Sequence, residues 1–197
     1  MTKKTKNLIT TMLALVVVFF IQNEKALSQN VSTKQGSVTI EGTSNIHDWE
    51  MVSDKGNCSV TIIKDANGNI TAMNNIVFSV SINTIKSDKG STMDNNAYKA
   101  MDAEKFPLIY FKSTSTSIKP AASGGWVVTA QGKLNISSGV RDVTLVGVAK
   151  SNPDNSITVN GNYKLLTTDY NVKPISIMLG AIKTSASVNI VYSLSLK

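Results

Sequence analysis

The segment STMDNNAYKAMDAEKFPLIYF, residues 91–111, holds the one clear helical pattern in a chain that otherwise shows strand patterns. Ser91 is suited to an N-cap position, and Asp94 follows three residues later as an acidic capping partner. Phe106-Pro107 predicts the end of the helix, because proline disfavours helical backbone angles in the residue before it. Apolar residues recur at helical spacing and predict one buried face: Met93, Ala97, Ala100 and Met101.

Residues 108–111 continue directly from this helix as a strand, because they are rich in β-branched and aromatic side chains. A short helix that leads straight into a strand commonly covers one end of a sheet or barrel. The pattern therefore predicts that residues 91–106 form either a lid over a cavity or a plain surface crossover, and both alternatives stay open.

The segments around the helix alternate apolar and polar residues with a period of two, which is typical of half-buried strands. Asn67-Gly68 is the strongest hairpin signal, because both residue types tolerate positive φ angles in a tight turn. Residues 167–183 form a long connection that contains Pro174 and Gly180. Strand patterns cover residues 36–41, 46–52, 58–64, 70–82, 108–117, 126–136, 140–150, 156–166 and 187–196.

This organisation predicts an all-β fold of about eight strands with one short helical insert. Strands and helices do not alternate along the chain, so a parallel sheet is not expected. A closed antiparallel barrel and a two-sheet sandwich both fit the pattern. The length of the chain predicts a single domain with a real hydrophobic core.

The N-terminal residues show the pattern of a secretory signal peptide. Three lysines lie within the first six residues, and residues 8–21 form an apolar core that is shorter than a comfortable membrane-spanning helix. Small residues lead up to position 28, so we expect cleavage after Ser28 and a mature domain of residues 29–197. The expected location is the periplasm or the exterior of the cell, and an uncleaved signal anchor is the alternative. No later segment predicts a membrane span.

The formal net charge of +7 comes partly from this leader. Removing residues 1–28 takes away four lysines and one glutamate, so the mature chain carries about +4. The remaining lysines are scattered and Arg141 is the only arginine, which argues against a nucleic-acid groove. Cys58 is the only cysteine, so an internal disulfide is excluded. A buried strand position is expected for it, with a reactive thiol or an intermolecular bridge as the alternative.

Catalytic chemistry has one weak candidate, His47 beside Asp48. Ser44 or Cys58 would have to supply the nucleophile. Adjacent residues of a strand point to opposite faces, so Asp48 is poorly placed to orient His47. Packing of His47 and Trp49 at a barrel mouth, with one polar tip each, is the better interpretation. One histidine and one cysteine exclude multi-histidine and paired-cysteine metal sites, and no motif predicts a cofactor.

Apolar side chains on the inward faces of the strands are the better candidate site. An eight-stranded barrel either fills its interior with side chains or holds one small ligand. An apolar lining solvates a hydrocarbon chain and offers little to a polar substrate, whereas a filled core leaves no site. The expected cavity wall consists of Trp49, Phe78, Ile82, Met93, Ile109, Phe111, Trp126, Leu134, Tyr163 and Ile190.

Three segments follow one another along the chain: GTSNIHDWE (residues 42–50), SINTIKSDKGSTMDNNAYKAMDAEKFPLIYFKSTS (81–115) and GKLNISSGVRDVTLVGVA (132–149). In this order they resemble the motifs of the YceI-like, polyisoprenoid-binding family, in its secreted Bacteroidetes-type branch. The resemblance covers residues 36–197. It implies an extended eight-stranded antiparallel barrel of lipocalin-like shape, an apolar channel for an isoprenoid or other lipid, and export to the periplasm. It brings no catalytic residues.

The leading hypothesis is a non-enzymatic protein that binds and carries an apolar lipid, an isoprenoid or fatty chain, in the periplasm. A solid barrel that serves as an interaction or stress-response module is the alternative without a small-molecule ligand. A small hydrolase that uses His47 is a third interpretation. The sequence also leaves a homodimer open.

Overall fold

The computed structural model describes residues 26–197, so the predicted signal peptide lies outside the described residues apart from its last three. Leu27 and Ser28 belong to the first strand, where they pair with Lys64 and Ile63. Cleavage after Ser28 therefore stays a prediction, and it would remove two residues of this strand. No helix within residues 26–197 combines the length and the apolar character needed to cross a membrane.

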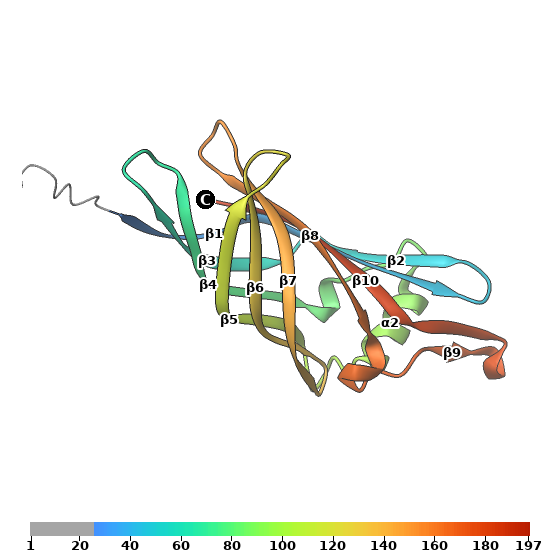
Figure 1. The fold of residues 1–197 in the computed structure, drawn as a ribbon. Helices are drawn as coiled ribbons and strands as arrows, with labels where there is room; N and C mark the ends of the chain where they lie inside the picture. Colours follow the sequence, from blue (N-terminus) through green and yellow to red (C-terminus); the bar gives the residue numbers. More distant parts are fainter. Residues whose placement is uncertain (1–25) are drawn as a thin grey trace, which may run out of the picture.

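Ten strands are present in the described residues, and eight of them close into a barrel (Figure 1). The ring runs β1-β3-β4-β5-β6-β7-β8-β10, and β10 pairs with β1 to close it. The ring is antiparallel throughout, so the barrel prediction is confirmed and the sandwich alternative is wrong. The strands are β1 (Leu27–Ser44), β2 (Asp48–Ser53), β3 (Asn57–Lys64), β4 (Ile70–Ser81), β5 (Leu108–Pro120), β6 (Trp126–Ile136), β7 (Gly139–Ser151), β8 (Ile157–Leu166), β9 (Ser176–Ile177) and β10 (Ile182–Leu196).

The strands β2 and β9 lie outside the ring and extend two of its strands. Residues 38–43 of β1 pair with β2, whereas residues 27–32 of the same strand pair with β3. β9 pairs with the first two residues of β10. We call the hairpin of residues 38–53 and the hairpin of residues 176–183 the two arms, which project from the same end of the barrel (Figure 1).

The predicted helix is present as α2 (Ser91–Ala100), but both of its predicted ends are wrong. Gly90 is the N-cap, with a φ of 89° and no side-chain capping bond, so Ser91 is the first helical residue. The helix ends well before Phe106-Pro107, because Asp102 adopts a left-handed φ of 51° and turns the chain. Proline therefore comes after a turn, and the turn itself ends the helix.

Asp94 does not cap the helix, and its buried carboxylate binds the preceding loop. Its oxygen Oδ1 accepts a hydrogen bond from the backbone N–H of Ser87 at 2.8 Å. Its oxygen Oδ2 lies 3.5 Å from the ammonium group of Lys86, which is itself largely exposed. The carboxylate therefore fixes the approach of the loop to α2.

Three further boundaries differ from the predictions. His47 lies in the turn before β2, because Ser44 accepts hydrogen bonds from the backbone of residues 46 and 47. β4 contains a bulge at Asn75, whose φ is 53°, and it ends before Ile82. Ile82 belongs to the short helix η2 (Ile82–Thr84). The long connection after β8 contains η3 (Thr167–Tyr170), β9 and η4 (Met178–Gly180).

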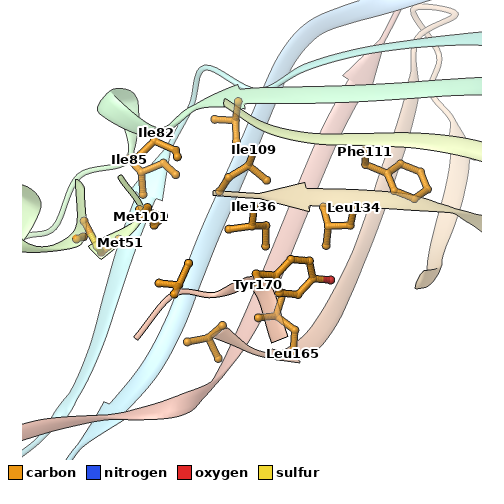
Figure 2. Packing of buried hydrophobic residues seen from close by; sticks show 14 of the residues in the cluster. Met51, Ile82, Ile85, Met101, Ile109, Phe111, Leu134, Ile136, Leu165 and Tyr170 are labelled. Carbon is orange, nitrogen blue, oxygen red and sulfur yellow. The ribbon is translucent and has the colours of Figure 1, made fainter. Parts of the chain in front are cut away.

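Two hydrophobic clusters fill the barrel, one toward each end. The cluster at the arm end combines barrel residues with Met101, which follows α2, and with Tyr170 of η3, as Figure 2 shows. Gly139 permits this approach of η3, because a Cβ atom there would lie 2.2 Å from the Cα of Tyr170. The second cluster lies at the opposite end and is built around Ile62, Met73 and Leu196. The helices α2 and η3 therefore close the arm end.

Candidate functional site

Two apolar cavities lie in the interior of the protein, and the larger, inside the ring, has a volume of about 110 Å³. We call it the barrel cavity. Its wall is almost wholly hydrocarbon, because alternate residues of the strands point inward. Polar atoms come from only a few side chains, among them Cys58, Tyr163 and Tyr192.

Tyr192 fits into this wall because Gly161 makes room for its ring. A Cβ atom on Gly161 would lie 2.4 Å from the tyrosine oxygen and 2.5 Å from Cζ of the ring. The hydroxyl donates a hydrogen bond to the carbonyl oxygen of Val146 at 3.0 Å. Burial raises the pKa of Tyr192 to about 12, so this hydroxyl stays protonated at neutral pH.

Cys58 is buried in β3 and lines the barrel cavity, as expected for the only cysteine of the chain. Burial raises the pKa of its thiol from 9.0 to about 12. The thiolate is the nucleophilic form of cysteine, so a thiol in this environment is a poor nucleophile. Cys58 therefore acts as a small apolar wall residue.

The second cavity, about 90 Å³, lies where the barrel meets α2, η3 and the arms. We call it the mouth cavity. Its lining includes Trp49 and Met51 of β2, Ala97 of α2, Met101 directly after it, and Pro174 of the connection after η3. The residues that line both cavities are Ile40, Ile109 and Ile190. The two cavities are therefore neighbours along one apolar interior.

One polar atom in the mouth cavity has no hydrogen-bond partner. Among residues 26–197, Oγ1 of Thr167 is the one buried side-chain nitrogen or oxygen atom left unpaired. Leaving a buried hydroxyl unpaired costs about 1–3 kcal/mol, so native proteins seldom tolerate it without a reason. By contrast, the nearby Thr184 hydroxyl accepts a hydrogen bond from the backbone N–H of Ile175 at 2.9 Å.

Both cavities are small for a ligand site. Pockets that enclose a drug-sized ligand usually measure about 300–1,000 Å³. At about 110 and 90 Å³, the barrel and mouth cavities hold only a short apolar group without rearrangement of their walls.

Seven of the ten predicted wall residues line these cavities. Trp49 lines the mouth cavity and packs across Gly42. Those that line the barrel cavity are Phe78, Ile109, Phe111, Leu134, Tyr163 and Ile190.

Ile82, Met93 and Trp126 lie elsewhere. Ile82 is fully buried in η2, and Trp126 packs against the cluster at the opposite end of the barrel. Met93 lies on α2, where its sulfur accepts a hydrogen bond from the hydroxyl of Ser87 at 3.1 Å.

Sequence reasoning missed the residues that close the mouth cavity. Thr167, Tyr170, Pro174 and Ile175 all come from the connection between β8 and β10. No periodic pattern marks this segment, because it consists of short turns rather than of a regular strand. The one sequence feature that could have indicated these residues is Pro174, which lies in a long connection with few charged residues.

The residues considered for catalysis do not form a catalytic group. His47 is exposed, and its Nδ1 atom lies 2.7 Å from the backbone oxygen of Asp48. The hydroxyl of Ser44 donates to the backbone oxygen of His47 at 2.7 Å, so it belongs to the turn. In the described part of the chain, no three His, Cys, Asp or Glu side chains gather in a way that could hold a metal ion.

A wide polar groove of about 690 Å³ is lined by residues of the first arm, β8, β10 and the loop before α2. Its lining mixes charges of both signs, including Glu41, Asp48, Glu50, Lys89 and Lys164. An open groove with mixed charge lacks the apolar wall of the interior cavities. The interior cavities are therefore the stronger candidate site.

A family model of the YceI-like domain matches residues 29–196. Among solved structures, Burkholderia cenocepacia BcnA is similar with 18% identity and a TM-score of 0.61, over 81% of this chain and 95% of that chain. A Campylobacter jejuni YceI protein shows 18% identity and a TM-score of 0.51, over 72% of this chain and 82% of that chain. A polyisoprenoid binding domain from Saccharophagus degradans, implicated in plant cell wall breakdown, shows 11% identity and a TM-score of 0.55, over 85% and 97% of the two chains. A comparison with curated proteins gives no match.

Proposed function

Because the chain belongs to the YceI-like family, we propose that it binds an apolar lipid, an isoprenoid or fatty chain, inside its barrel and carries it without catalysing a reaction. The observation that supports this most is the apolar interior, in which the barrel and mouth cavities share three isoleucines. Such a lining gives a hydrocarbon favourable contacts and leaves a polar substrate without hydrogen-bond partners. The ligand class agrees with the Saccharophagus degradans domain of similar fold, which is named for polyisoprenoid binding.

In this proposal a lipid chain enlarges the two cavities into one channel as it enters. Tyr170 and Met101 line the mouth cavity; Tyr170 belongs to η3, and Met101 directly follows α2. Neither residue belongs to a ring strand, so both can shift without breaking the hydrogen bonds of the barrel. The helices α2 and η3 thus act as a lid over the arm end.

The unpaired hydroxyl of Thr167 provides a contact for the polar end of the ligand. It lies in the mouth cavity, next to walls that offer only carbon atoms along most of their surface. A lipid alcohol, carboxylate or ester oxygen placed here would pair with the hydroxyl and remove the cost of leaving it unpaired. The apolar chain would then extend toward the barrel cavity.

We place this activity in the periplasm or outside the cell. The basic residues and the apolar run at the N-terminus support export, as does the expected cleavage after Ser28. Several observations support carriage rather than catalysis: the exposed position of His47, the turn role of Ser44 and the high pKa of Cys58.

A variant that fills the barrel cavity tests the proposal. Ala130 lines that cavity, and Ala130→Leu would occupy part of its volume of about 110 Å³. Thr129→Leu is the matched control, because its side chain points to the opposite face of β6. Titrating a dansyl-labelled fatty acid and a dansyl-labelled isoprenoid alcohol, we expect wild type and the control to bind. Ala130→Leu should bind at least about tenfold more weakly.

A solid barrel that serves as an interaction module is the second candidate function. The small volumes of the two cavities favour a solid barrel, because a full-length lipid does not fit into them unless their walls rearrange. In the same titration this function predicts that wild type binds neither probe. It also predicts that Ala130→Leu raises stability, because the added side chain fills empty space.

A further inference from the structure

The ends of the two arms meet at one asparagine. The backbone N–H of Asn45 donates to the carbonyl oxygen of Lys183 at 3.1 Å. The side-chain nitrogen of Asn45 donates to the carbonyl oxygen of Ala181 at 2.8 Å, and its side-chain oxygen accepts from the N–H of Lys183 at 2.8 Å. The two arms therefore end in one shared structure, although their turns lie more than 130 residues apart in sequence.

This shared end presents large apolar side chains to solvent. We call Ile46, Ile177, Met178 and Leu179 the apolar tip. Ile46 is 57% exposed, Met178 is 72% exposed and Leu179 is fully exposed. Contiguous exposed apolar side chains are uncommon on soluble proteins and usually mark an interaction surface.

Folding of the hairpin does not explain these residues. Met178 and Leu179 have φ angles of 51° and 54°, in the left-handed region where Gly and Asn fit without strain. A bulky apolar residue in this region is strained, and here two stand side by side. The loop therefore retains large apolar side chains at positions where they disfavour the turn, which points to a role outside the fold.

The charges around the apolar tip suit an anionic lipid surface. No charged residue occurs from Pro174 to Ile182, and exposed lysines, Lys173 and Lys183, flank this uncharged stretch. An apolar insertion loop with basic flanks is the arrangement that favours binding to membranes with anionic head groups. Asp48 and Glu50 follow the turn of the other arm, so only the tip itself is suited to enter the bilayer.

The apolar tip is connected directly to the mouth cavity. Ile175 lines that cavity and is joined to Thr184 on the opposite side of the hairpin by backbone and side-chain hydrogen bonds. Ile177 follows two residues later, in β9. The chain thus runs from the wall of the mouth cavity to the exposed tip within a few residues.

We propose that the apolar tip inserts shallowly into a lipid membrane, with Lys173 and Lys183 at the anionic head groups and the arm end of the barrel facing the bilayer. Docking in this orientation brings the mouth cavity close to the lipid from which a chain is taken up. The transfer of a chain rests on the proposed function, whereas the docking itself does not.

Cosedimentation with vesicles tests the docking. The protein, in the form that the cell exports, is mixed with vesicles of phosphatidylethanolamine and phosphatidylglycerol, and in parallel with vesicles of phosphatidylcholine alone. We expect wild type to bind the anionic vesicles more tightly. Met178→Asn/Leu179→Asn should bind them at least about tenfold more weakly, because two apolar side chains no longer insert. Val146→Thr, an exposed apolar position on the outer wall of β7, is the control and should bind like wild type.

The double variant Met178→Asn/Leu179→Asn should fold normally, so a loss of vesicle binding would not be due to misfolding. Asparagine accepts left-handed backbone angles, so thermal stability should stay equal to that of wild type or rise. Vesicle binding by the double variant that equals that of wild type overturns the proposal, as does a wild type without affinity for anionic vesicles. Light scattering that shows dimers of wild type but not of the double variant, in the absence of vesicles, also overturns it, because the tip then binds a second copy.

Titrations with the dansyl-labelled fatty acid and the dansyl-labelled isoprenoid alcohol in solution separate this proposal from the proposed function. Wild type that binds vesicles but neither soluble probe would retain the docking and refute lipid carriage. Wild type that binds a probe but not vesicles would retain carriage and refute the docking.

Discussion

The indole ring of Trp49 lies directly across Gly42 on the neighbouring strand. A Cβ atom at residue 42 would lie 2.2 Å from Cζ2 of the indole, and the ring Nε1–H donates to the carbonyl oxygen of Thr43 at 3.1 Å. The two residues are register partners in the β1–β2 hairpin. Trp49 lines the mouth cavity, so the glycine that makes room for its ring is part of how the site is built.

Gly42→Ala should therefore displace the indole and destabilise the protein by about 1–3 kcal/mol. Urea denaturation followed by far-UV circular dichroism measures the change. A double-mutant cycle with Trp49→Val provides the control, since Gly42→Ala should cost little once the indole is absent. If Gly42→Ala lowers stability equally in wild type and in Trp49→Val, then Gly42 does not position the indole ring.

Thr167→Val should raise the free energy of unfolding of the ligand-free protein by about 1 kcal/mol, because it removes a buried hydroxyl that has no partner. The matched control is Thr184→Val in the same cavity, which should lower it by about 1 kcal/mol, because the backbone N–H of Ile175 loses its acceptor. Chemical denaturation of both variants measures these changes. A loss of stability in Thr167→Val would mean that the hydroxyl is already paired in solution.

Stability should decline with rising pH above about pH 9 because of Cys58. Burial raises the pKa of this thiol from 9.0 to about 12 in the folded protein. The unfolded chain gives up the proton first, so the stabilising contribution is full below pH 9 and is lost progressively between pH 9 and pH 12. Between pH 9 and pH 10, the free energy of unfolding of Cys58→Ala should fall by about 1 kcal/mol less than that of wild type. Identical slopes for the two proteins in denaturation series at stepped pH would contradict this assignment.

Asp94→Asn should destabilise the protein by about 1–3 kcal/mol, since it weakens the bond to the N–H of Ser87 and removes the ion pair with Lys86. Lys86→Met leaves the bond to Ser87 intact and should cost at most about 1 kcal/mol, because the ammonium group is largely exposed. Thermal unfolding of both variants compares the two contributions. A larger cost for Lys86→Met would place the stabilising interaction in the ion pair instead.

Much of the barrel could be predicted from the sequence, because alternation of apolar and polar residues reports which side of a strand faces inward. Phe78, Phe111 and Leu134 were predicted to lie on the wall for this reason, and they line the barrel cavity. The bulge at Asn75 shifts the pairing of β4, and the turn of β4 into η2 removes Ile82 from the wall. A local change of backbone angle leaves no trace in the hydrophobic pattern.

The mouth cavity was the less predictable part, for a related physical reason. Thr167 and Tyr170 belong to a single turn of helix, and Ile175 belongs to an irregular connection, so each is positioned by contacts with distant strands. Gly139 illustrates the dependence, because its missing side chain is what lets η3 approach the barrel. Such contacts between segments far apart in sequence are specified by the tertiary fold and not by local periodicity.

The most direct test of lipid carriage is native mass spectrometry, with lipid extraction, of the protein isolated from the cells that produce it. The account predicts a stoichiometric isoprenoid or fatty chain on wild type, retained by Thr129→Leu and lost or strongly reduced in Ala130→Leu, whose added side chain enters the barrel cavity. Wild type that is free of lipid, and that stays free after incubation with isoprenoid alcohols and fatty acids, would contradict the account and favour the solid barrel.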